Sequence, residues 1–243
     1  MKKANKLQSL WITIRSCCWT IWLSLVTIYL SYFGTPERID KLLFNWSRGL
    51  LKIVKLSYRV FNPYQVSFEP NKAYIIMSNH ASLYDIPIIF VSIPGRIRMI
   101  AKKELFRVPI WGRALKEAEF IMIDRENSAQ AIADLAVAKQ KMENGVAIWV
   151  APEGTRSRDG KLHIFKKGAF MLALQTGATI IPVGIRGAGK VLPPKTLQYT
   201  LGEQVEVHIG KPIDTQQYTR ENRNELIRAV RQSIAEAAAV EMA

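Results

Sequence analysis

The sequence predicts an α/β protein whose mainly parallel central sheet is flanked by helices and preceded by an N-terminal two-helix segment that anchors to membranes. Short apolar runs alternate along the chain with stretches of helical periodicity, a pattern typical of α/β proteins. The apolar runs carry almost no charge, as expected of strands covered on both faces of a parallel sheet. A long uncharged stretch near the N-terminus, followed by an amphipathic one, indicates the membrane-anchoring segment.

Apolar runs and helical spacing place the elements of the main domain. Strands are expected at residues 74–78, 96–101, 120–124, 146–151, 179–185 and 204–209. Helices are expected at residues 128–143, 166–176 and 220–239. A chain of 243 residues accommodates one α/β domain and an appendage. We therefore expect a helical hairpin over residues 1–62 and a single larger domain over residues 63–243.

The N-terminal segment begins with basic residues and continues without charge. Lys2, Lys3, Lys6 and Arg15 precede eighteen uncharged residues from Ser16 to Phe33, a length at the lower edge of a membrane-spanning helix. A cleaved signal peptide would also begin with basic residues. The apolar region is long for a signal peptide, however, and its end lacks a small-x-small cleavage pattern.

A second helix is expected after the break at Gly34-Thr35-Pro36. On a helical wheel one face is apolar and the opposite face basic. The apolar face holds Ile39, Leu42, Leu43, Trp46, Leu50, Ile53 and Val54, and the basic face holds Lys41, Arg48, Lys52, Lys55 and Arg59. This pattern predicts a helix lying in a membrane interface; the alternative is an amphipathic helix packed on the protein core. Positive charge flanks the uncharged stretch on both sides, so it favours neither orientation of a single span. We therefore prefer a hairpin that enters one leaflet and returns to the same side, and a single span is the alternative.

Composition restricts the partners and excludes some kinds of site. The net charge of +14 favours polyanionic partners, namely nucleic acid, an anionic membrane surface or phosphorylated substrates. The two cysteines, Cys17 and Cys18, are adjacent inside an apolar run, which fits neither a zinc site nor a disulfide framework. With three histidines in the chain, a multi-histidine metal site is not expected either. We expect no metal and no cofactor.

Four polar clusters each follow a predicted strand. They are Asn79-His80 with Asp85, Lys102-Lys103, Asp124-Arg125, and the segment 152–157, Pro-Glu-Gly-Thr-Arg-Ser. Histidine exchanges protons near neutral pH, and a carboxylate within reach fixes its tautomer. His80 and Asp85 stand five positions apart, about one and a half helical turns, so they meet on a helix or turn. The alternative is a solvent-capped histidine at a strand end and an aspartate that starts a helix.

The arginines and the glycine of these clusters are residue types that commonly bind an anion. The planar guanidinium of arginine forms paired charged hydrogen bonds with phosphate, and Gly154 lets the backbone approach a ligand. Taken one by one, arginines such as Arg125 and Arg156 are more often surface salt-bridge partners. Their common placement after strands predicts an anion site beside a proton-transfer centre.

These residues resemble the motifs of the glycerolipid acyltransferase family, and within it the bacterial lysophosphatidate (1-acylglycerol-3-phosphate) acyltransferases. Residues 79–85 match the His-x-x-x-x-Asp signature, 120–125 the second motif, 152–157 the third and Ile181-Pro182-Val183 the fourth. The resemblance covers roughly residues 70–215, and the two N-terminal helices resemble the family's membrane-anchoring motif. Glu119 stands where the second motif usually opens with glycine, and Ala151 where the third usually has phenylalanine. We interpret both as packing changes.

The resemblance implies an activity and roles for the residues. It implies transfer of a fatty acyl chain from acyl-CoA or acyl carrier protein to the free hydroxyl of lysophosphatidate, giving phosphatidate. His80 would be the general base and Asp85 would orient it. The domain over 63–243 would then be the catalytic domain. Substrate binding would fall to Asn79, Lys102, Arg125, Glu153, Gly154, Thr155, Arg156 and Lys166. Of these, Glu153 cannot hold phosphate directly, and its polarity suggests that it holds a hydroxyl or a neighbouring arginine.

The implied partners are membrane phospholipids, lysophosphatidate and the acyl donors, with no nucleic acid. The implied location is the cytoplasmic face of the inner (plasma) membrane, with a monotopic or single-pass attachment. Two alternatives are the same chemistry on another acceptor, such as glycerol 3-phosphate or another lysolipid, and a basic membrane- or nucleic-acid-binding module without catalysis.

Two further features resemble known sites without fitting them. The run 184–191 nearly spells a phosphate-binding loop, but Val191 replaces the required hydroxyl and Pro193-Pro194 prevents the helix that should follow. Ser82 is expected to line the site or cap a helix rather than act as a nucleophile.

Overall fold

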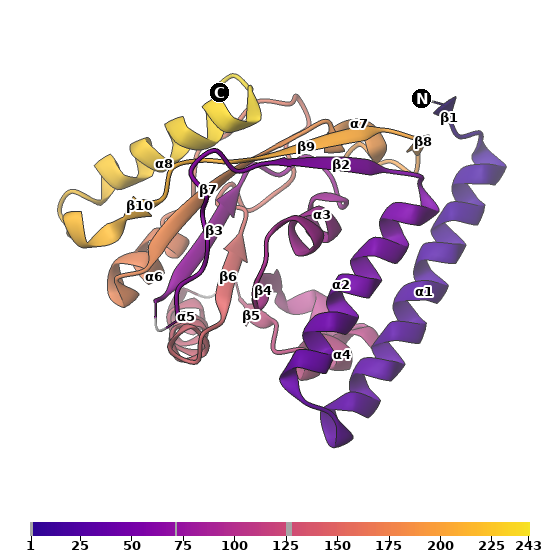
Figure 1. Cartoon of the computed structure of the whole chain (residues 1–243), viewed down its shortest axis with the longest axis horizontal. Coiled ribbons are helices and arrows are strands. Elements are labelled where there is room, and N and C mark those ends of the chain that lie inside the picture. Colours follow the sequence, from indigo (N-terminus) through magenta and orange to yellow (C-terminus); the bar gives the residue numbers. More distant parts are fainter. Residues whose placement is uncertain (1, 71, 125–127) are drawn as a thin grey trace.

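A single mixed sheet, mostly parallel, forms the centre of the molecule (Figure 1). The structure, a computed structural model, describes residues 2–70, 72–124 and 128–243. The strand order is β2-β9-β7-β3-β6-β4-β5, with β10 paired to β7. These strands are β2 (Ser57–Phe61), β3 (Tyr74–Ser78), β4 (Ile97–Lys102), β5 (Ile121–Ile123), β6 (Ala147–Val150), β7 (Thr179–Arg186), β9 (Gln204–Ile209) and β10 (Ile213–Asp214). Strands β7, β3, β6, β4 and β5 are parallel, and β9 and β10 run antiparallel to β7.

The six predicted strands are all present, so the predicted fold class is confirmed. Among the strands that were not predicted, β2 lies within the range 1–62 assigned to the N-terminal hairpin, yet it pairs with β9 and forms one edge of the sheet. Its residues, Ser-Tyr-Arg-Val-Phe, are mostly exposed, as is common for an edge strand, and lack the uncharged run that revealed the central strands. A small second sheet pairs β1 (Lys2–Lys3) with β8 (Thr200–Leu201).

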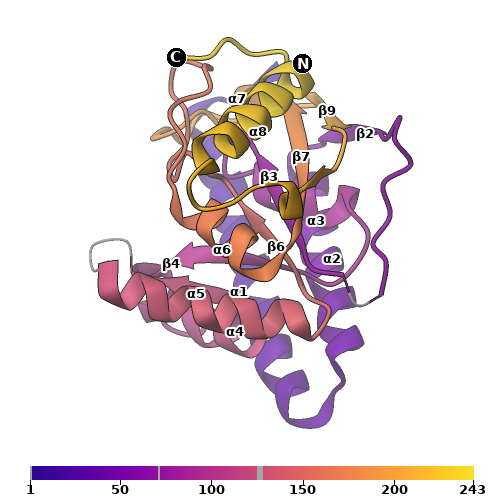
Figure 2. The ribbon, with the colours of Figure 1, turned by 90° about the vertical axis from the view of Figure 1, so that its left-hand side faces the viewer.

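Helices cover both faces of the sheet (Figure 2). They are α1 (Lys6–Phe33), α2 (Pro36–Ile53), α3 (Asp85–Ser92), α4 (Trp111–Glu117), α5 (Ser128–Glu143), α6 (Gly168–Thr176), α7 (Ala188–Val191) and α8 (Arg223–Ala238), with short 3₁₀ turns η1 (Lys103–Arg107) and η2 (Thr215–Gln217). An apolar core lies on each face of the sheet, and alternate residues of β3 point into one core or the other. Ile75 and Met77 pack with α5, α6 and α8, whereas Tyr74 and Ile76 pack with α1, α2, α3 and α4.

The first two helices form an antiparallel hairpin whose two ends both join the main domain. The Trp19 indole donates to the Trp46 carbonyl at 3.0 Å, and the Trp46 indole donates to Thr20 at 3.1 Å. Gly49 permits this contact, since a Cβ there would lie 2.2 Å from Trp19 Nε1. The chain enters the hairpin from β1, which is paired with β8, and leaves it into β2.

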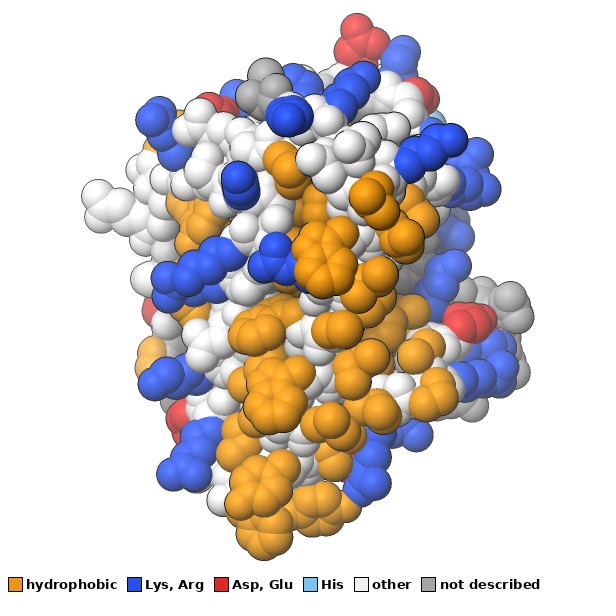
Figure 3. All heavy atoms as spheres, turned by 90° about the vertical axis from the view of Figure 1, so that its right-hand side faces the viewer, with side chains coloured by type: hydrophobic (Ala, Val, Ile, Leu, Met, Phe, Trp, Pro, Cys, Tyr) orange, Lys and Arg blue, Asp and Glu red, His pale blue; other side chains and the backbone are white. Residues whose placement is uncertain are grey.

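The expectation that the apolar stripe of the second helix lies in the membrane interface is wrong. Ile39 and Val54 of the stripe are buried in the core, and Leu43, Trp46, Leu50 and Ile53 pack against it, so the alternative of a helix packed on the core is correct. Most of the exposed large apolar side chains of the hairpin lie on α1, where Trp11 and Trp22 are each 60% exposed. In Figure 3 apolar side chains form a continuous band on this side of the molecule, with lysine and arginine on both flanks.

A buried charge cluster ties the hairpin to the sheet. Arg98 of β4 is 1% exposed and pairs with Asp40 of α2 at 2.7 Å and with Glu119 at 3.4 Å. Glu119 also pairs with Arg96. The backbone at Glu119 is left-handed, with φ of 62°, which explains why a glycine is usual at this position. In this chain the ion pairs of the glutamate offset the strain of that conformation.

Candidate active site

The polar clusters predicted from the sequence follow strands that are neighbours in the sheet. Strands β3, β6, β4 and β5 are consecutive and parallel, so the residues after their carboxyl ends meet along one edge. His80 follows β3 and Glu153 follows β6, Lys102 ends β4, and Asp124 follows β5. Adjacent strands lie about 4.8 Å apart, so the end of β4 is about 10 Å from the end of β3.

Asn79 lies between the end of β3 and His80, and its side chain forms hydrogen bonds with the backbone of β7. Its side-chain amide donates to the Ile185 carbonyl at 2.9 Å, and its oxygen accepts from the Ile185 N–H at 2.8 Å. The asparagine therefore imitates one more step of the pairing between β3 and β7 while its own backbone is free to turn. Both polar atoms of the side chain are occupied, and its expected contact with substrate stays a prediction.

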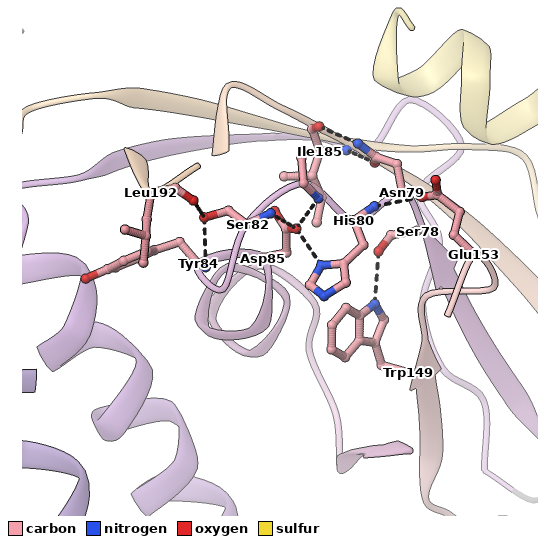
Figure 4. A network of polar contacts seen from close by, with 11 residues as sticks. Ser78, Asn79, His80, Ser82, Tyr84, Asp85, Trp149, Glu153, Ile185 and Leu192 are labelled. Atoms are coloured by element: carbon pink, nitrogen blue, oxygen red, sulfur yellow. Dashed lines mark hydrogen bonds and ion pairs between the residues drawn. The ribbon is translucent and has the colours of Figure 1, made fainter. Parts of the chain in front are cut away.

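His80 and Asp85 form a direct pair (Figure 4). His80 Nδ1 lies 2.7 Å from Asp85 Oδ2, and the same oxygen accepts from the backbone N–H groups of Ala81 at 2.7 Å and Ser82 at 2.8 Å. Asp85 is the first residue of α3 and its side chain is 1% exposed, against 16% for His80. Because a carboxylate only accepts, the neutral ring carries its hydrogen on Nδ1, which leaves Nε2 to take a proton from a hydroxyl.

Ser82 is part of this turn and is fully buried. Its hydroxyl donates to the Leu192 carbonyl at 2.9 Å and accepts from the Tyr84 N–H at 3.2 Å. The serine thus caps the turn that leads into α3, and its oxygen does not face His80 as a nucleophile would.

The third motif, residues 152–157, forms hydrogen bonds with the main chain of His80. Glu153 accepts from the His80 N–H at 3.2 Å and from the His163 N–H at 3.0 Å, and the Ser157 N–H donates to the His80 carbonyl at 2.7 Å. The sequence suggested a hydroxyl or an arginine as partner of Glu153, whereas the structure shows two backbone amides. Burial raises the pKa of Glu153, and the two N–H groups partly oppose that rise.

Trp149 of β6 was not singled out in the sequence. Its ring packs edge-on to the His80 imidazole, with centroids 6.1 Å apart, and its indole N–H donates to Ser78 at 3.0 Å. The tryptophan is buried and restricts the ring of His80 on the side away from Asp85 (Figure 4). The sequence did contain a signal for Trp149, because it lies in the strand that leads directly into the third motif. Its side chain is on the same face of that strand as Ala147.

The remaining predicted residues surround this pair at greater exposure. Gly154 has a left-handed backbone with φ of 72°, which favours glycine. Thr155 and Lys166 are exposed and Arg156 is half-buried, and the Lys166 N–H closes the loop by donating to the Pro152 carbonyl at 2.8 Å.

The cations beyond β4 and β5 are only partly described. Lys102 is exposed, and its neighbour Lys103 pairs with Asp124 at 2.8 Å. Arg125 lies outside the described residues. Within the described part of the chain, no three His, Cys, Asp or Glu side chains gather closely enough to hold a metal ion.

The glycine-rich run 184–191, which begins inside β7, has a packing role. A Cβ at Gly184 would lie 2.1 Å from the backbone of Ala237 and Ala238, so this glycine lets α8 approach β7. The run continues into the four-residue helix α7.

Comparison with known proteins identifies the relatives of this arrangement. The chain is 34% identical over 168 residues to human 1-acyl-sn-glycerol-3-phosphate acyltransferase alpha, a segment covering 69% of this chain and 59% of the human protein. It is 33% identical over 139 residues to the chloroplastic 1-acyl-sn-glycerol-3-phosphate acyltransferase LPAT1 of Arabidopsis thaliana, covering 57% of this chain and 39% of that protein. The chain therefore matches less than two thirds of the length of these relatives.

A solved structure matches nearly the whole chain. The crystal structure of the 1-acyl-sn-glycerophosphate (LPA) acyltransferase PlsC from Thermotoga maritima superposes with a TM-score of 0.78 at 26% identity, covering 97% of this chain and 96% of that one. The sequence model of the family described as Acyltransferase matches residues 59–186, more than half of the chain, and this range includes His80, Asp85 and the segment 152–157. The chain belongs to the acyltransferase family.

Proposed function

We propose that this chain transfers a fatty acyl chain from acyl-CoA or acyl carrier protein to the free hydroxyl of lysophosphatidate and so forms phosphatidate. The observation that carries the proposal is the 2.7 Å contact between His80 Nδ1 and Asp85 Oδ2, at the edge of the sheet where β4 ends in Lys102 and β6 leads into the loop of Arg156. The names of the human, plant and Thermotoga relatives support the choice of acceptor.

The reaction then needs one base and no covalent enzyme intermediate. His80 Nε2 takes the proton of the acceptor hydroxyl as the hydroxyl oxygen attacks the thioester carbonyl carbon. The tetrahedral intermediate collapses with cleavage of the C–S bond, and the leaving thiolate takes from Nε2 the proton that came from the hydroxyl. Asp85 stabilises the imidazolium formed between the two transfers. The occupied hydroxyl of Ser82 supports direct transfer over an acyl-enzyme route.

The phosphate of the acceptor is assigned to cations around the pair. Arg156 and Lys166 come from the loop that follows β6, Lys102 comes from the end of β4, and Arg125 is the last residue of the second motif. A phosphomonoester carries close to two negative charges at neutral pH, so several cations are needed to hold it. We place Glu153 as a positioning residue that fixes the backbone of His80.

Attachment at the cytoplasmic face of the plasma membrane is part of the proposal. Helix α1 is long and apolar enough to cross a membrane, and most of it is exposed. Both ends of the hairpin join the same domain, through β1 and β2, which supports a monotopic attachment over a single span. We propose that the outer face of α1 lies among the lipids while the basic face of α2 meets their head groups.

The activity is tested by thiol release from acyl-CoA and from acyl carrier protein, each combined with lysophosphatidate, glycerol 3-phosphate and monoacylglycerol. We expect transfer to lysophosphatidate, a large loss on the phosphate-free acceptor, and no transfer by His80→Ala. His208→Gln is the matched control, because His208 also contacts a carboxylate, Glu206 at 2.9 Å, but on β9. Substantial transfer by His80→Ala contradicts the mechanism. A preference for glycerol 3-phosphate would mean that this compound, and not lysophosphatidate, is the acceptor. Tight nucleic-acid binding without transfer would favour a binding module.

Membrane attachment is tested by flotation with vesicles. Trp11→Glu combined with Leu25→Glu places two charges on the exposed face of α1 without touching the core, since the two side chains are 60% and 47% exposed. We expect this variant to stay in solution while His80→Ala floats with the vesicles. Continued flotation of the charged variant shows that the anchor lies elsewhere.

A further inference from the structure

A groove separate from the His80 site runs between α1 and α2 on the outer side of the hairpin. Its volume is about 490 Å³, and it shares no residue with the candidate active site. Arg15 of α1 and Lys52 of α2 stand on its walls, and both are exposed. Neither helix supplies an acid nearby, because residues 6–33 and 41–68 contain no Asp or Glu. Within the described residues neither cation takes part in an ion pair, so the groove has two charges available to a ligand.

The lower part of the groove is apolar and aromatic. Cys18, Trp19 and Trp22 line it from α1 and Gly49 lines it from α2, whereas Ile53 lies beside Lys52 at the cationic end. Trp22 is seven residues from Arg15 on the same helix, which places it about 10 Å further along the axis. Arg15 is also the last charge before the uncharged stretch of α1, so the groove passes from cationic to apolar where that stretch begins.

We propose that this groove binds one anionic phospholipid, with its phosphate between Arg15 and Lys52 and its hydrocarbon chain along Trp22. Charge complementarity selects the head group, and the aromatic wall selects a ligand with an apolar tail over free phosphate or a nucleotide. The exposed apolar face of α1 continues from Trp22 to Leu25 and Tyr29, which gives the tail a path toward the tip of the hairpin. The site would hold a structural lipid and fix the rotation of the hairpin at the membrane surface.

This inference rests on the proposed contact of α1 with lipid, and the two cysteines provide a test that does not depend on catalysis or vesicle binding. Cys17 and Cys18 are both exposed, but only Cys18 lines the groove. In the variants Cys17→Ser and Cys18→Ser, the rate of maleimide labelling reports on the remaining thiol. The full-length protein is kept in a neutral detergent and titrated with dioctanoyl phosphatidylglycerol, dioctanoyl phosphatidylcholine or inorganic phosphate.

We expect phosphatidylglycerol to slow the labelling of Cys18 saturably, by about tenfold at ten times its dissociation constant, and to leave Cys17 within about twofold. Arg15→Gln with Lys52→Gln should weaken this protection about thirtyfold. The matched pair Lys41→Gln with Arg48→Gln removes the same charge from the basic face of α2 but touches no wall of the groove, and it should retain the protection within about twofold of the unsubstituted chain.

Several outcomes overturn the proposal. Equal protection of both cysteines, or equal loss in the two charge pairs, indicates a diffuse basic surface without a site. If inorganic phosphate protects Cys18 as well as phosphatidylglycerol does, the groove is an anion site that needs no lipid. If phosphatidylcholine protects Cys18 as well as phosphatidylglycerol does, the lipid need not be anionic. Because the titration uses a dispersed short-chain lipid, a protein that floats with vesicles and catalyses transfer but shows no protection contradicts only the groove.

Discussion

Replacing Asp85 by asparagine removes the charge behind His80 while keeping the size of the side chain. Oδ2 of Asp85 accepts three hydrogens, from His80 Nδ1 and from the backbone of Ala81 and Ser82. An amide oxygen in the same place still accepts all three, so the turn and the His80 tautomer are preserved. The variant therefore removes the electrostatic support that the carboxylate gives to the imidazolium and keeps the three hydrogen bonds of the turn, although its NH2 takes the buried place of Oδ1, which has no hydrogen-bond partner among the described residues.

The size of the effect follows from the geometry. Two unit charges whose centres are about 4 Å apart attract by about 4 kcal/mol at an effective dielectric constant of 20, which suits a pair as enclosed as this one. A neutral hydrogen bond to the asparagine oxygen recovers about 1 kcal/mol. The remaining difference of about 3 kcal/mol corresponds to a fall in kcat of about two hundredfold.

The assay is the initial rate of thiol release at saturating lysophosphatidate. We expect the loss to appear in kcat with little change in KM, because Asp85 is buried and does not face the acceptor. Asp214→Asn is the matched control: its carboxylate also accepts a backbone N–H, from Gln216 at 2.9 Å, but it lies at the opposite end of the sheet. A natively folded Asp85→Asn variant with kcat within about threefold of the unsubstituted chain would refute the base mechanism.

Three further predictions concern stability. Burial raises the pKa of Glu153 above its ordinary 4.5, so ionisation costs the folded state more than the unfolded state. As pH rises from 4.5 through that raised pKa, the unsubstituted chain should lose unfolding free energy relative to Glu153→Gln in thermal melts; a flat difference contradicts the burial argument. Gly184→Ala should destabilise by about 2 kcal/mol, because the new Cβ meets backbone of α8 at 2.1 Å, and an unchanged Tm would show that α8 moves freely. Asp40→Asn leaves the buried Arg98 with less compensation and should cost about 2 kcal/mol or more, with faster hydrogen exchange in α2; unaltered exchange there would mean that the cluster does not hold the hairpin.

The central strands were predictable because each is a short uncharged run bounded by polar residues, as the two covered faces of a parallel sheet require. The edge strand β2 escaped prediction because only one of its sides is paired, so its residues need not be apolar. The apolar stripe of α2 was recognised correctly, but the surface that covers it was not. Periodicity identifies an apolar face and is silent on whether lipid, α1 or α3 buries it.

The sequence alone determined which residue types stand at which positions: a histidine and a carboxylate at a spacing that lets them meet, cations after predicted strands, and an uncharged segment long enough to cross a membrane. The tertiary structure decided which groups act on which. Asn79 and Glu153 hold backbone rather than standing free, Trp149 flanks His80, and α1, not α2, carries the exposed apolar face. The physical reason is that residue type and local spacing set what a side chain can do, whereas its partner is set by elements that come from elsewhere in the chain.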